Sequence, residues 1–294
     1  MKYFCKHILF LLVTLILASF FLDYLYTSVY CNFKPRSKFS YIESLKPKKI
    51  DYVFLGSSRV ANTIDADLVE NISKKSAINL GIEGADLNDN LLELRLLVSR
   101  NVKIGTLYLQ VDHFFESNTD LFVAKAEALP FLRDSTVSSH FKECEFDYYI
   151  NYYVPFYRYI ENSPKIGFRE LLLVFLEKES KTNFENGFMP KFGKNNGKIE
   201  VLPTTISKNN NSLEKIEKIC KQNNIKLVLF CAPFCSNTKN LDYIKKLKKI
   251  QPNLIDYSQV INDSLFFDGG HLNNEGAKLF TTKFVLENII KIND

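Results

Sequence analysis

The 294-residue sequence has little charge surplus over most of its length. Residues 1–49 carry eight Lys/Arg and two Asp/Glu, whereas residues 50–294 carry 30 Lys/Arg and 31 Asp/Glu. A protein that binds nucleic acid through its phosphates needs a basic face. The near balance from residue 50 onward provides none, so we expect no nucleic-acid partner.

The motifs of several common site classes are missing as well. Neither G-x-G-x-x-G nor G-x-x-x-x-G-K follows an apolar run, which argues against nucleotide binding. The spacing of the six cysteines matches neither a zinc ribbon nor a redox C-x-x-C motif; they are Cys5, Cys31, Cys144, Cys220, Cys231 and Cys235. We therefore expect free thiols, no metal and no cofactor. With 46% apolar and 24% charged residues, the composition is that of a globular protein.

A long apolar run opens the chain. From Ile8 to Leu22 every residue is apolar or small and uncharged, and Asp23 is the only charge between that run and Lys34. A helix over residues 8–30 would be about 34 Å long, enough to cross a hydrocarbon core of roughly 30 Å. The run predicts a single-pass transmembrane anchor at residues 1–31, with Tyr24, Tyr26 and Tyr30 at the membrane interface.

Two features of this segment stay open. A cleaved signal peptide is the alternative to an anchor, because Lys2 and Lys6 precede a short apolar core, although Ala18-Ser19 is a poor cleavage site. The short basic N-terminus favours a cytoplasmic start, whereas the Lys/Arg residues of 34–49 favour a cytoplasmic position for the side that follows the span. Residues 32–49 are expected to form a polar, basic tether.

Short apolar runs alternate with helical patterns from residue 50 onward. The expected strands are 52–55, 77–82, 106–111, 226–231 and 254–257, and the expected helices lie near 64–72, 86–97, 212–223, 241–250 and 273–290. Buried strands that alternate with helices indicate a parallel sheet covered on both faces. We predict a three-layer α/β/α domain at 50–294, with a flavodoxin-like strand order.

The alternation is interrupted between residues 113 and 204. Nine Phe/Tyr residues gather between 141 and 159, and residues 185–211 are rich in Asn, Gly and Lys. We expect an aromatic-rich, partly helical insertion at 113–204. Its aromatic side chains either form a core or stack on sugar rings.

Polar residues follow the expected strands, where open parallel sheets bind their ligands. They are Gly56-Ser57-Ser58, Gly84 and Asp112, and a fourth group, Asp268-Gly-Gly-His271, precedes the last helix. A carboxylate three residues before an imidazole can hold Nδ1 and leave Nε2 as a base, which a serine nucleophile requires. The alternative is structural: the serines make the turn and cap a helix, and Asp268 caps the last helix.

These motifs resemble those of the SGNH/GDSL hydrolase superfamily, and more narrowly its membrane-anchored branch associated with O-acetylation of cell-surface polysaccharides. FLGSSR stands where the family has G-D-S, INLGIEGAD resembles the second block, and FFDGGHLN resembles the last block, D-x-x-H. The resemblance covers residues 50–112 and 212–291. It implies Ser58 as nucleophile, with Ser57 as the alternative, His271 as base, Asp268 as the residue that orients it, and Gly84 as an oxyanion donor.

The resemblance also implies a function. It is that of a serine-dependent esterase or O-acyltransferase that acts on an acetyl ester of a cell-surface carbohydrate (a polysaccharide) outside the cytoplasm, with a multi-span acyltransferase partner in the same membrane. The alternative is a catalytically weak or inactive relative that binds polysaccharide or scaffolds a membrane acyltransferase.

The third block departs from the family pattern. Where the family has G-x-N-D, this sequence has Gln110-Val111-Asp112-His113, so that Asp112 replaces an Asn that donates to the oxyanion. An amide donor there is worth about 3–4 kcal/mol, and a carboxylate would repel the same charge. Either Asp112 is protonated, or Gln110 or His113 donates instead, or the oxyanion hole is weaker. Arg59 either binds an acidic group of the substrate or is an exposed residue at the start of a helix.

Overall fold

The computed structural model describes residues 1–116, 123–144, 147–160, 164–180, 182–194 and 196–290, and these form two compact units. A helical unit contains Met1–Ser44 and Ala124–Ser180, and an α/β unit contains Leu45–Val123 and Lys181–Asp294. The expected insertion at 113–204 is therefore too long at both ends. Its first and last parts pack with the α/β unit, because they lie against the polar edge of the sheet described below. Phe146, counted in the expected aromatic group, lies outside the described residues.

The α/β unit is built on a five-stranded, all-parallel sheet. The strands are β1 (Lys49–Leu55), β2 (Ala77–Asn79), β3 (Lys103–Gln110), β4 (Lys226–Cys231) and β5 (Ile255–Asp256), and their order is β2-β1-β3-β4-β5. Leu55 pairs with Leu109, and Gln110 pairs with Phe230. The turns that follow β1, β3 and β4 consequently start along one edge of the sheet. The α/β class and the five expected strands are confirmed.

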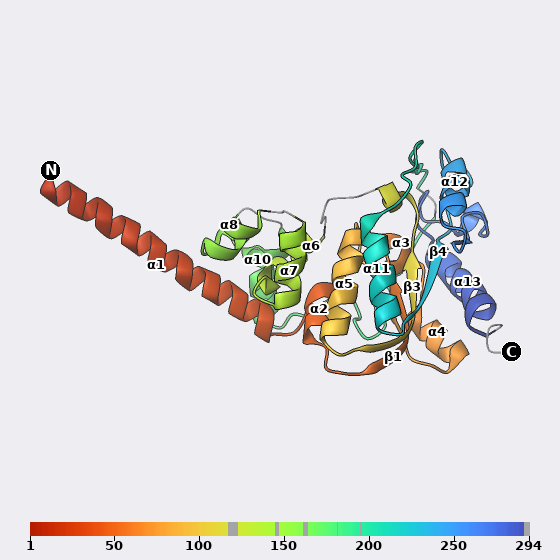
Figure 1. Ribbon diagram of the computed structural model, residues 1–294, viewed down its shortest axis with the longest axis horizontal. Helices are drawn as coiled ribbons and strands as arrows, with labels where there is room; N and C mark the ends of the chain where they lie inside the picture. The colour runs from red at the N-terminus through yellow and green to blue at the C-terminus, as the bar shows by residue number, and fades with distance from the viewer. Residues whose placement is uncertain (117–122, 145–146, 161–163, 181, 195, 291–294) are drawn as a thin grey trace. The chain divides into compact units, whose positions relative to one another are not determined.

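Helices cover both faces of this sheet (Figure 1). Helices α4 (Ala66–Ser73) and α13 (Asn274–Val285) lie on one face, and α5 (Leu87–Ser99) and α11 (Asn211–Gln222) lie on the other. The shorter elements of the unit are α3 (Ser58–Ala61), α12 (Asp242–Ile250), η1 (His113–Glu116), η4 (Asp263–Leu265) and η5 (Leu286–Ile290). Asp86 caps α5 as expected, and its side chain accepts the N–H groups of Asn88 and Asp89.

Strand side chains alternate between the two faces and bury both of them. Phe54, Tyr108 and Phe230 join one core cluster with Phe280 and Phe284 of α13. The Phe284 ring lies 5.1 Å from both the Tyr108 and the Phe230 rings. The intervening strand residues are also buried, as a parallel sheet between two helical layers requires. The ends of β1, β3 and β4 are thereby fixed in position.

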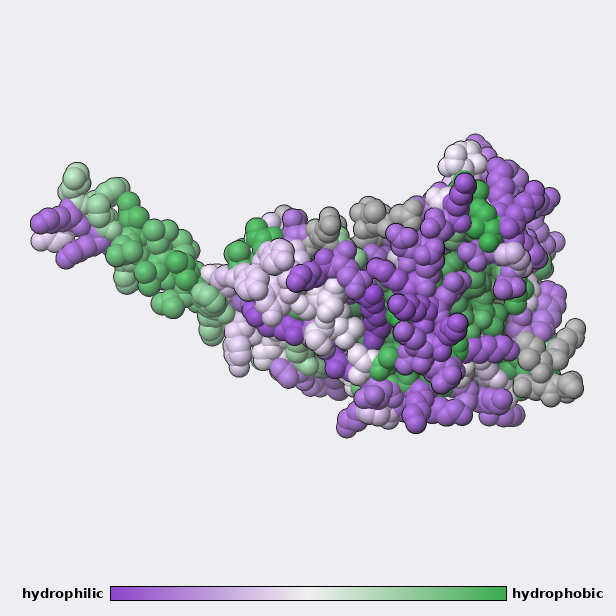
Figure 2. All heavy atoms as spheres, in the orientation of Figure 1, coloured by the Kyte–Doolittle hydropathy of each residue, from purple (hydrophilic) through white to green (hydrophobic). Residues whose placement is uncertain are grey.

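The helical unit surrounds the end of a long apolar helix. Its elements are α1 (Lys2–Asn32), α2 (Lys38–Ser44), α6 (Ala124–Glu127), η2 (Leu129–Phe131), α7 (Ser135–Glu143), α8 (Tyr148–Tyr153), α9 (Tyr157–Ile160), η3 (Pro164–Ile166) and α10 (Phe168–Phe175). By length and composition α1 can cross a membrane: its most apolar stretch has a mean hydropathy of 2.4 and no buried residue. Figure 2 shows this stretch as a continuous green surface.

The end of α1 corrects two sequence-based expectations. Tyr24 is exposed, but Tyr26 and Tyr30 are buried against Tyr159 instead of facing a membrane interface. Residues 32–49 are not a simple tether, since they contain α2, which buries Phe39 and Ile42. Aromatic and aliphatic side chains at these positions find partners inside the unit, and this burial outweighs the polar character of the local sequence.

Candidate active site

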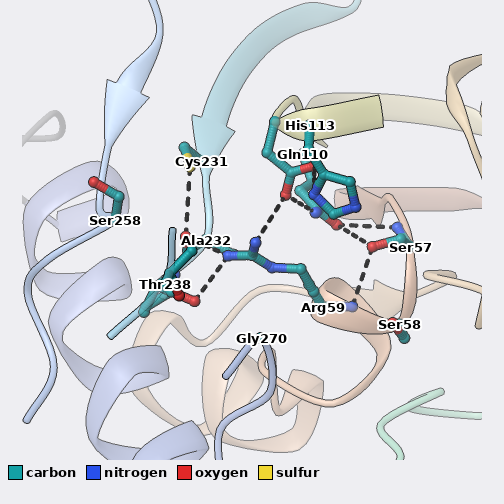
Figure 3. Close-up of polar contacts among 12 residues, drawn as sticks. Ser57, Ser58, Arg59, Gln110, His113, Cys231, Ala232, Thr238, Ser258 and Gly270 are labelled. Atoms are coloured by element: carbon teal, nitrogen blue, oxygen red, sulfur yellow. Dashed lines mark hydrogen bonds and ion pairs between the residues drawn. The ribbon is translucent and has the colours of Figure 1, made fainter. Parts of the chain in front are cut away.

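The turn after β1 contains two adjacent serines whose side chains have different surroundings. The side chain of Ser57 caps α3 by accepting the Arg59 N–H at 3.2 Å, and its hydroxyl donates to Gln110 Oε1 at 3.1 Å. The preceding Gly56 has no room for a side chain, because a Cβ there would lie 2.6 Å from Gln110 Oε1. Ser57 is therefore held inside the turn, and Figure 3 shows it facing Gln110.

Ser58 has the opposite environment. Between residues 52 and 64 it is the one position that is not buried. Its Oγ lies 2.8 Å from Nε2 of His271, although the two residues are 213 positions apart. This is the contact that the sequence motifs predict, and it favours Ser58 over Ser57 as the reactive hydroxyl.

The loop before α13 holds His271 in one orientation. Asp268 Oδ1 lies 2.7 Å from His271 Nδ1 and also accepts the N–H groups of Gly270 and His271 at 3.0 and 2.9 Å. An ionised carboxylate at Nδ1 selects the tautomer that carries its proton there. Nε2 then has a free lone pair and accepts the hydroxyl proton of Ser58.

Asp268 is ionised in this arrangement. Partial burial raises the pKa of its carboxyl group, but the hydrogen bond and charge of His271 and the two backbone N–H groups outweigh burial and lower the pKa below its ordinary value. Asp268 does not cap α13, since Asn273 occupies that position and accepts the N–H of Gly276 at 2.9 Å. The expectation that Asp268 caps the last helix is therefore wrong.

The loop after β2 runs beside the serine turn. The Ile82 N–H donates to the Gly56 carbonyl at 3.0 Å, and Gly84 follows two residues later with a φ of +84°. Across the described parts of the chain, the backbone N–H groups of Ser58 and Gly84 have no hydrogen-bond acceptor. Two donors are thus unused, one in each of the turns where the resemblance places an oxyanion hole.

Asp112 is buried and is paired with Arg59 and His113. It is almost fully buried, accepts a hydrogen bond from Gln110 Nε2, and lies 3.4 Å from Arg59 Nη1 and 3.3 Å from His113 Nδ1. Burial raises the pKa of Asp112, but the Arg59 charge, together with His113 and Gln110, lowers it below its ordinary value. Of the interpretations left open by the sequence, a protonated Asp112 is not supported.

Arg59 is the partner of Asp112 and is not a surface residue. Its side chain is 3% exposed. Its Nη2 donates to the Ala232 and Pro233 carbonyls at 2.6 and 2.8 Å, and its guanidinium lies 3.2 Å from the centre of the Phe234 ring. Figure 3 shows this group bridging from the serine turn to the end of β4.

These contacts correct the expected roles of three residues. Gln110, Asp112 and Arg59 were expected at the oxyanion or substrate, but their polar groups are used within a buried network. Such a network is stable only when its members satisfy one another. Gln110 bonds to Ser57 and Asp112, and Asp112 balances the charge of Arg59, whose Nε is buried without a hydrogen-bond partner among the described residues. They hold the turn that contains Ser57 and Ser58 in place from its buried side.

His113 remains as a donor candidate in the third block. Burial lowers the pKa of its imidazole below the ordinary value, the Asp112 charge opposes that shift, and the charges of Arg59, Glu200 and His271 also act on the ring. The ring is consequently neutral at neutral pH and lies within electrostatic reach of His271. Its side chain is 20% exposed, which leaves it accessible from the site.

Comparison of the chain with protein-family models and with curated proteins gives no match. Among the described residues, no group of three His, Cys, Asp or Glu side chains is arranged to hold a metal ion. The chemistry of the site is therefore argued from its own geometry and from the motif resemblance.

One further component, which we call the strap, was not predicted from the sequence: residues 186–194 and 196–200. Its start bonds to β2 through the Asn186 carbonyl and the Asn79 N–H, at 2.9 Å. Met189 then exchanges hydrogen bonds with the end of α3, since its N–H donates to the Ala61 carbonyl and its carbonyl accepts from Asn62 Nδ2. The strap thus follows the surface next to the serine turn.

The second half of the strap borders the loop before α13 that contains Asp268 and His271. The Lys191 carbonyl accepts the Asn274 N–H at 2.7 Å, and the Lys198 carbonyl accepts the Gly269 N–H at 2.9 Å. Gly269 has no side chain because a Cβ would lie 2.6 Å from the Glu200 nitrogen. Lys191 also pairs with Glu83 at 2.7 Å. Asn- and Gly-rich composition alone could not predict these long-range contacts.

Proposed function

We propose that this protein is a serine-dependent esterase or O-acyltransferase that uses Ser58, His271 and Asp268. One observation carries the proposal: an unbroken chain of two hydrogen bonds, 2.8 Å from Ser58 Oγ to His271 Nε2 and 2.7 Å from Nδ1 to Asp268. A half-buried serine, a correctly oriented imidazole and an ionised carboxylate are the parts that nucleophilic acyl transfer requires.

The reaction proceeds in two steps. Ser58 Oγ attacks the ester carbonyl while His271 Nε2 takes its proton, and Asp268 stabilises the imidazolium. Collapse of the tetrahedral intermediate breaks the bond to the leaving alcohol, which receives the proton from Nε2. Water or a sugar hydroxyl then attacks the Ser58 ester, gives its proton to His271, and releases the acyl group as acid or as a new ester. That proton returns to Ser58 Oγ.

The unused N–H groups of Ser58 and Gly84 are the proposed oxyanion donors. A single such donor contributes about 3–4 kcal/mol to the transition state. Asp112 does not oppose them with an unbalanced charge, because the Arg59 guanidinium lies 3.4 Å from it. His113 is the nearest third-block side chain that could add a third donor.

The substrate class comes from the resemblance. The strand order β2-β1-β3-β4-β5 is that of a flavodoxin-like sheet, which agrees with an SGNH-type domain. The anchored branch that these motifs resemble supports an acetyl ester of a cell-surface polysaccharide, an extracytoplasmic site, α1 as an uncleaved anchor, and a multi-span acyltransferase partner.

A fluorophosphonate probe tests the proposal directly, because it phosphonylates only an activated serine. We expect one adduct per chain, located on Ser58 by mass spectrometry, and its loss in Ser58→Ala and His271→Ala. Ser57→Ala is the matched control and should keep the adduct, since the Ser57 hydroxyl faces Gln110. A folded wild-type protein without an adduct would refute the proposal.

A binding or scaffolding role is the second candidate, and the third block favours it, because Asp112 stands where the family has an Asn that donates to the oxyanion. In that case catalysis is dispensable. Ser58→Ala and His271→Ala variants would then both restore full surface acylation in a strain that lacks the protein, whereas the enzyme proposal expects neither to do so.

A further inference from the structure

The helical unit exposes many large apolar side chains. They lie on α8, α9 and α10 and on residues directly after these helices: Tyr149, Tyr153, Val154, Ile160, Phe168, Leu172, Phe175 and Leu176. Ile160 and Tyr153 are 70% and 69% exposed. Single exposed apolar residues are ordinary, but a concentration of this kind marks an interaction surface. We call residues 148–160 and 164–176 the collar.

Hydrogen bonds fix the height of the collar along α1. The Asp23 carboxylate accepts the Phe156 N–H at 3.0 Å and lies 2.9 Å from Arg158 Nη2. Phe156 and Arg158 therefore lie near the level of Asp23. The large apolar side chains of α1 are exposed as far as Leu25, apart from the intermediate Leu22, whereas Tyr26, Val29 and Tyr30 are buried. The collar thus begins near the end of the exposed part of α1.

The rest of the collar lies a short distance farther along α1. The Tyr30 hydroxyl donates to the Gly167 carbonyl at 3.4 Å, and the Phe33 and Phe175 rings are 5.5 Å apart. Seven residues of helix separate Asp23 from Tyr30, or about 10 Å. A headgroup layer is of similar thickness, roughly 5–8 Å on each side of the hydrocarbon core. The exposed side chains of α10 recur at positions 168, 172 and 175, which is one helical face.

We propose that the collar is a lipid-binding surface that lies in the headgroup region where α1 leaves the membrane. This inference rests on α1 being an uncleaved anchor. Both the collar and the part of α1 before it expose large apolar side chains, and Figure 2 shows green residues on that helix and on the rest of the helical unit. Half of the exposed collar residues are Tyr or Phe and half are aliphatic, a mixture suited to that layer.

The Asp23–Arg158 pair fits the same position. A carboxylate at the edge of the hydrocarbon core is costly unless it is paired. Arg158 is buried and supplies that charge, and its Nη2 also donates to Thr27 Oγ1 at 2.8 Å. The collar therefore neutralises the only acidic residue of α1 at the depth where lipid would otherwise surround it.

The chain contains no tryptophan, so single introduced Trp residues report their surroundings without background. The experiment uses the full-length protein in bilayers whose lipids carry bromine near the carbonyl level or deep in the acyl chains. Tyr153→Trp and Ile160→Trp report the collar, and Leu12→Trp, which lies 11 residues or about 16 Å before Asp23, reports the middle of the hydrocarbon core. Phe192→Trp is the control, since Phe192 is equally exposed but lies in the α/β unit.

We expect shallow bromine to quench both collar tryptophans more than deep bromine does, with the reverse order for Leu12→Trp and no quenching for Phe192→Trp. Unquenched collar tryptophans beside a quenched Leu12→Trp would overturn the proposal and leave a protein partner as the occupant. An unquenched Leu12→Trp would overturn the anchor and the collar together. Neither result bears on probe labelling of Ser58, so failure of the catalytic proposal is recognised separately.

Discussion

At the scale of single residues, the two neighbouring serines of one turn have different roles. A helix-capping hydroxyl must face back into the turn, and that requirement buries Ser57. The next residue begins the helix, and its side chain is free to meet His271. A reactive hydroxyl is thus presented by the residue that follows the cap.

Asp268→Asn should reduce kcat by about 10⁴-fold with little change in KM, because an amide cannot stabilise the imidazolium and favours the wrong tautomer. Hydrolysis of a chromogenic acetyl ester by the full-length protein measures this effect. The side chain also accepts two backbone N–H groups, so circular dichroism must show that the variant is folded. A loss below tenfold in a folded variant would contradict the orienting role.

Asp112→Asn should destabilise the protein by about 3–5 kcal/mol, since it leaves the buried Arg59 charge without its carboxylate. Chemical unfolding in detergent measures the change. Asp112→Asn combined with Arg59→Gln is the matched control and should recover part of the loss, because neither charge then remains. If Asp112→Asn were as stable as the wild type and more active, Asp112 would face the oxyanion after all.

Acid pH should weaken the fold through the same carboxylates. The pKa values of Asp112 and Asp268 are lowered from 3.8 in the folded state, so an unfolded chain binds more protons as the pH falls. Their stabilising contribution is therefore complete well above 3.8 and is lost as the pH falls from there toward the lower folded values. Unfolding free energies measured from pH 6 to pH 3 should fall steeply only at the acid end, and Asp112→Asn should reduce that slope. An unchanged slope would count against an ionised Asp112.

Some of these contacts could be predicted from sequence patterns, and others could not. The Asp268–His271 contact spans three positions and is predictable from local geometry alone. The Ser58–His271 contact was predictable only through motif order. The burial of Arg59 depends on carbonyls 173 and 174 positions away, and no local pattern carries that information.

At the scale of elements, the strap packs closely against the loop before α13 at Gly269, where there is no room for a side chain. Gly269→Ala would place a Cβ 2.6 Å from the Glu200 nitrogen and 2.7 Å from the Lys198 carbonyl oxygen, so backbone must move. We expect a loss of esterase activity, because the movement displaces the loop that holds His271.

Gly270→Ala is the matched control for that prediction. A Cβ at Gly270 would meet only the flexible carboxyl end of Glu200, at 3.2 Å. The Gly270 N–H to Asp268 is retained in the alanine variant. Near-normal activity of Gly270→Ala and loss in Gly269→Ala are the expected pair of results, and equal losses would show that the strap contact is not the cause.

The strands were predictable and the strap was not, for a physical reason. Parallel strands between two helical layers must be apolar on both sides, and this leaves continuous runs such as Tyr52–Leu55. The strap is held mainly by backbone hydrogen bonds to distant segments, among them β2, α3 and the loop before α13. Backbone groups are the same in every residue, so such contacts leave no periodic signal in the sequence.

At the scale of the whole molecule, α1 is long and apolar enough to cross a membrane, and its last part belongs to a folded unit. Composition identified its apolar run, but the division into anchor, tether and domain missed its partners. In the sequence Asp23 is a lone charge after the apolar run, whereas in the structure it forms an ion pair with the buried Arg158. The segments that meet here are more than 130 positions apart, so a local pattern could not join them.

Two truncations separate the roles of α1. Removal of residues 2–21 deletes most of the exposed apolar stretch and keeps Asp23, Tyr26, Val29 and Tyr30, whereas removal of residues 2–32 also deletes the buried part. The longer truncation exposes Tyr159 and leaves the Arg158 charge buried without a carboxylate, which costs about 3–5 kcal/mol. We expect the 2–21 deletion to unfold at nearly the wild-type temperature in mild detergent, and the 2–32 deletion to unfold at a clearly lower temperature or to aggregate. Asp23→Asn in the full-length chain should show the intermediate effect of losing the ion pair alone. Equal thermal stability of the two truncations would show that α1 contributes nothing to the fold beyond the membrane.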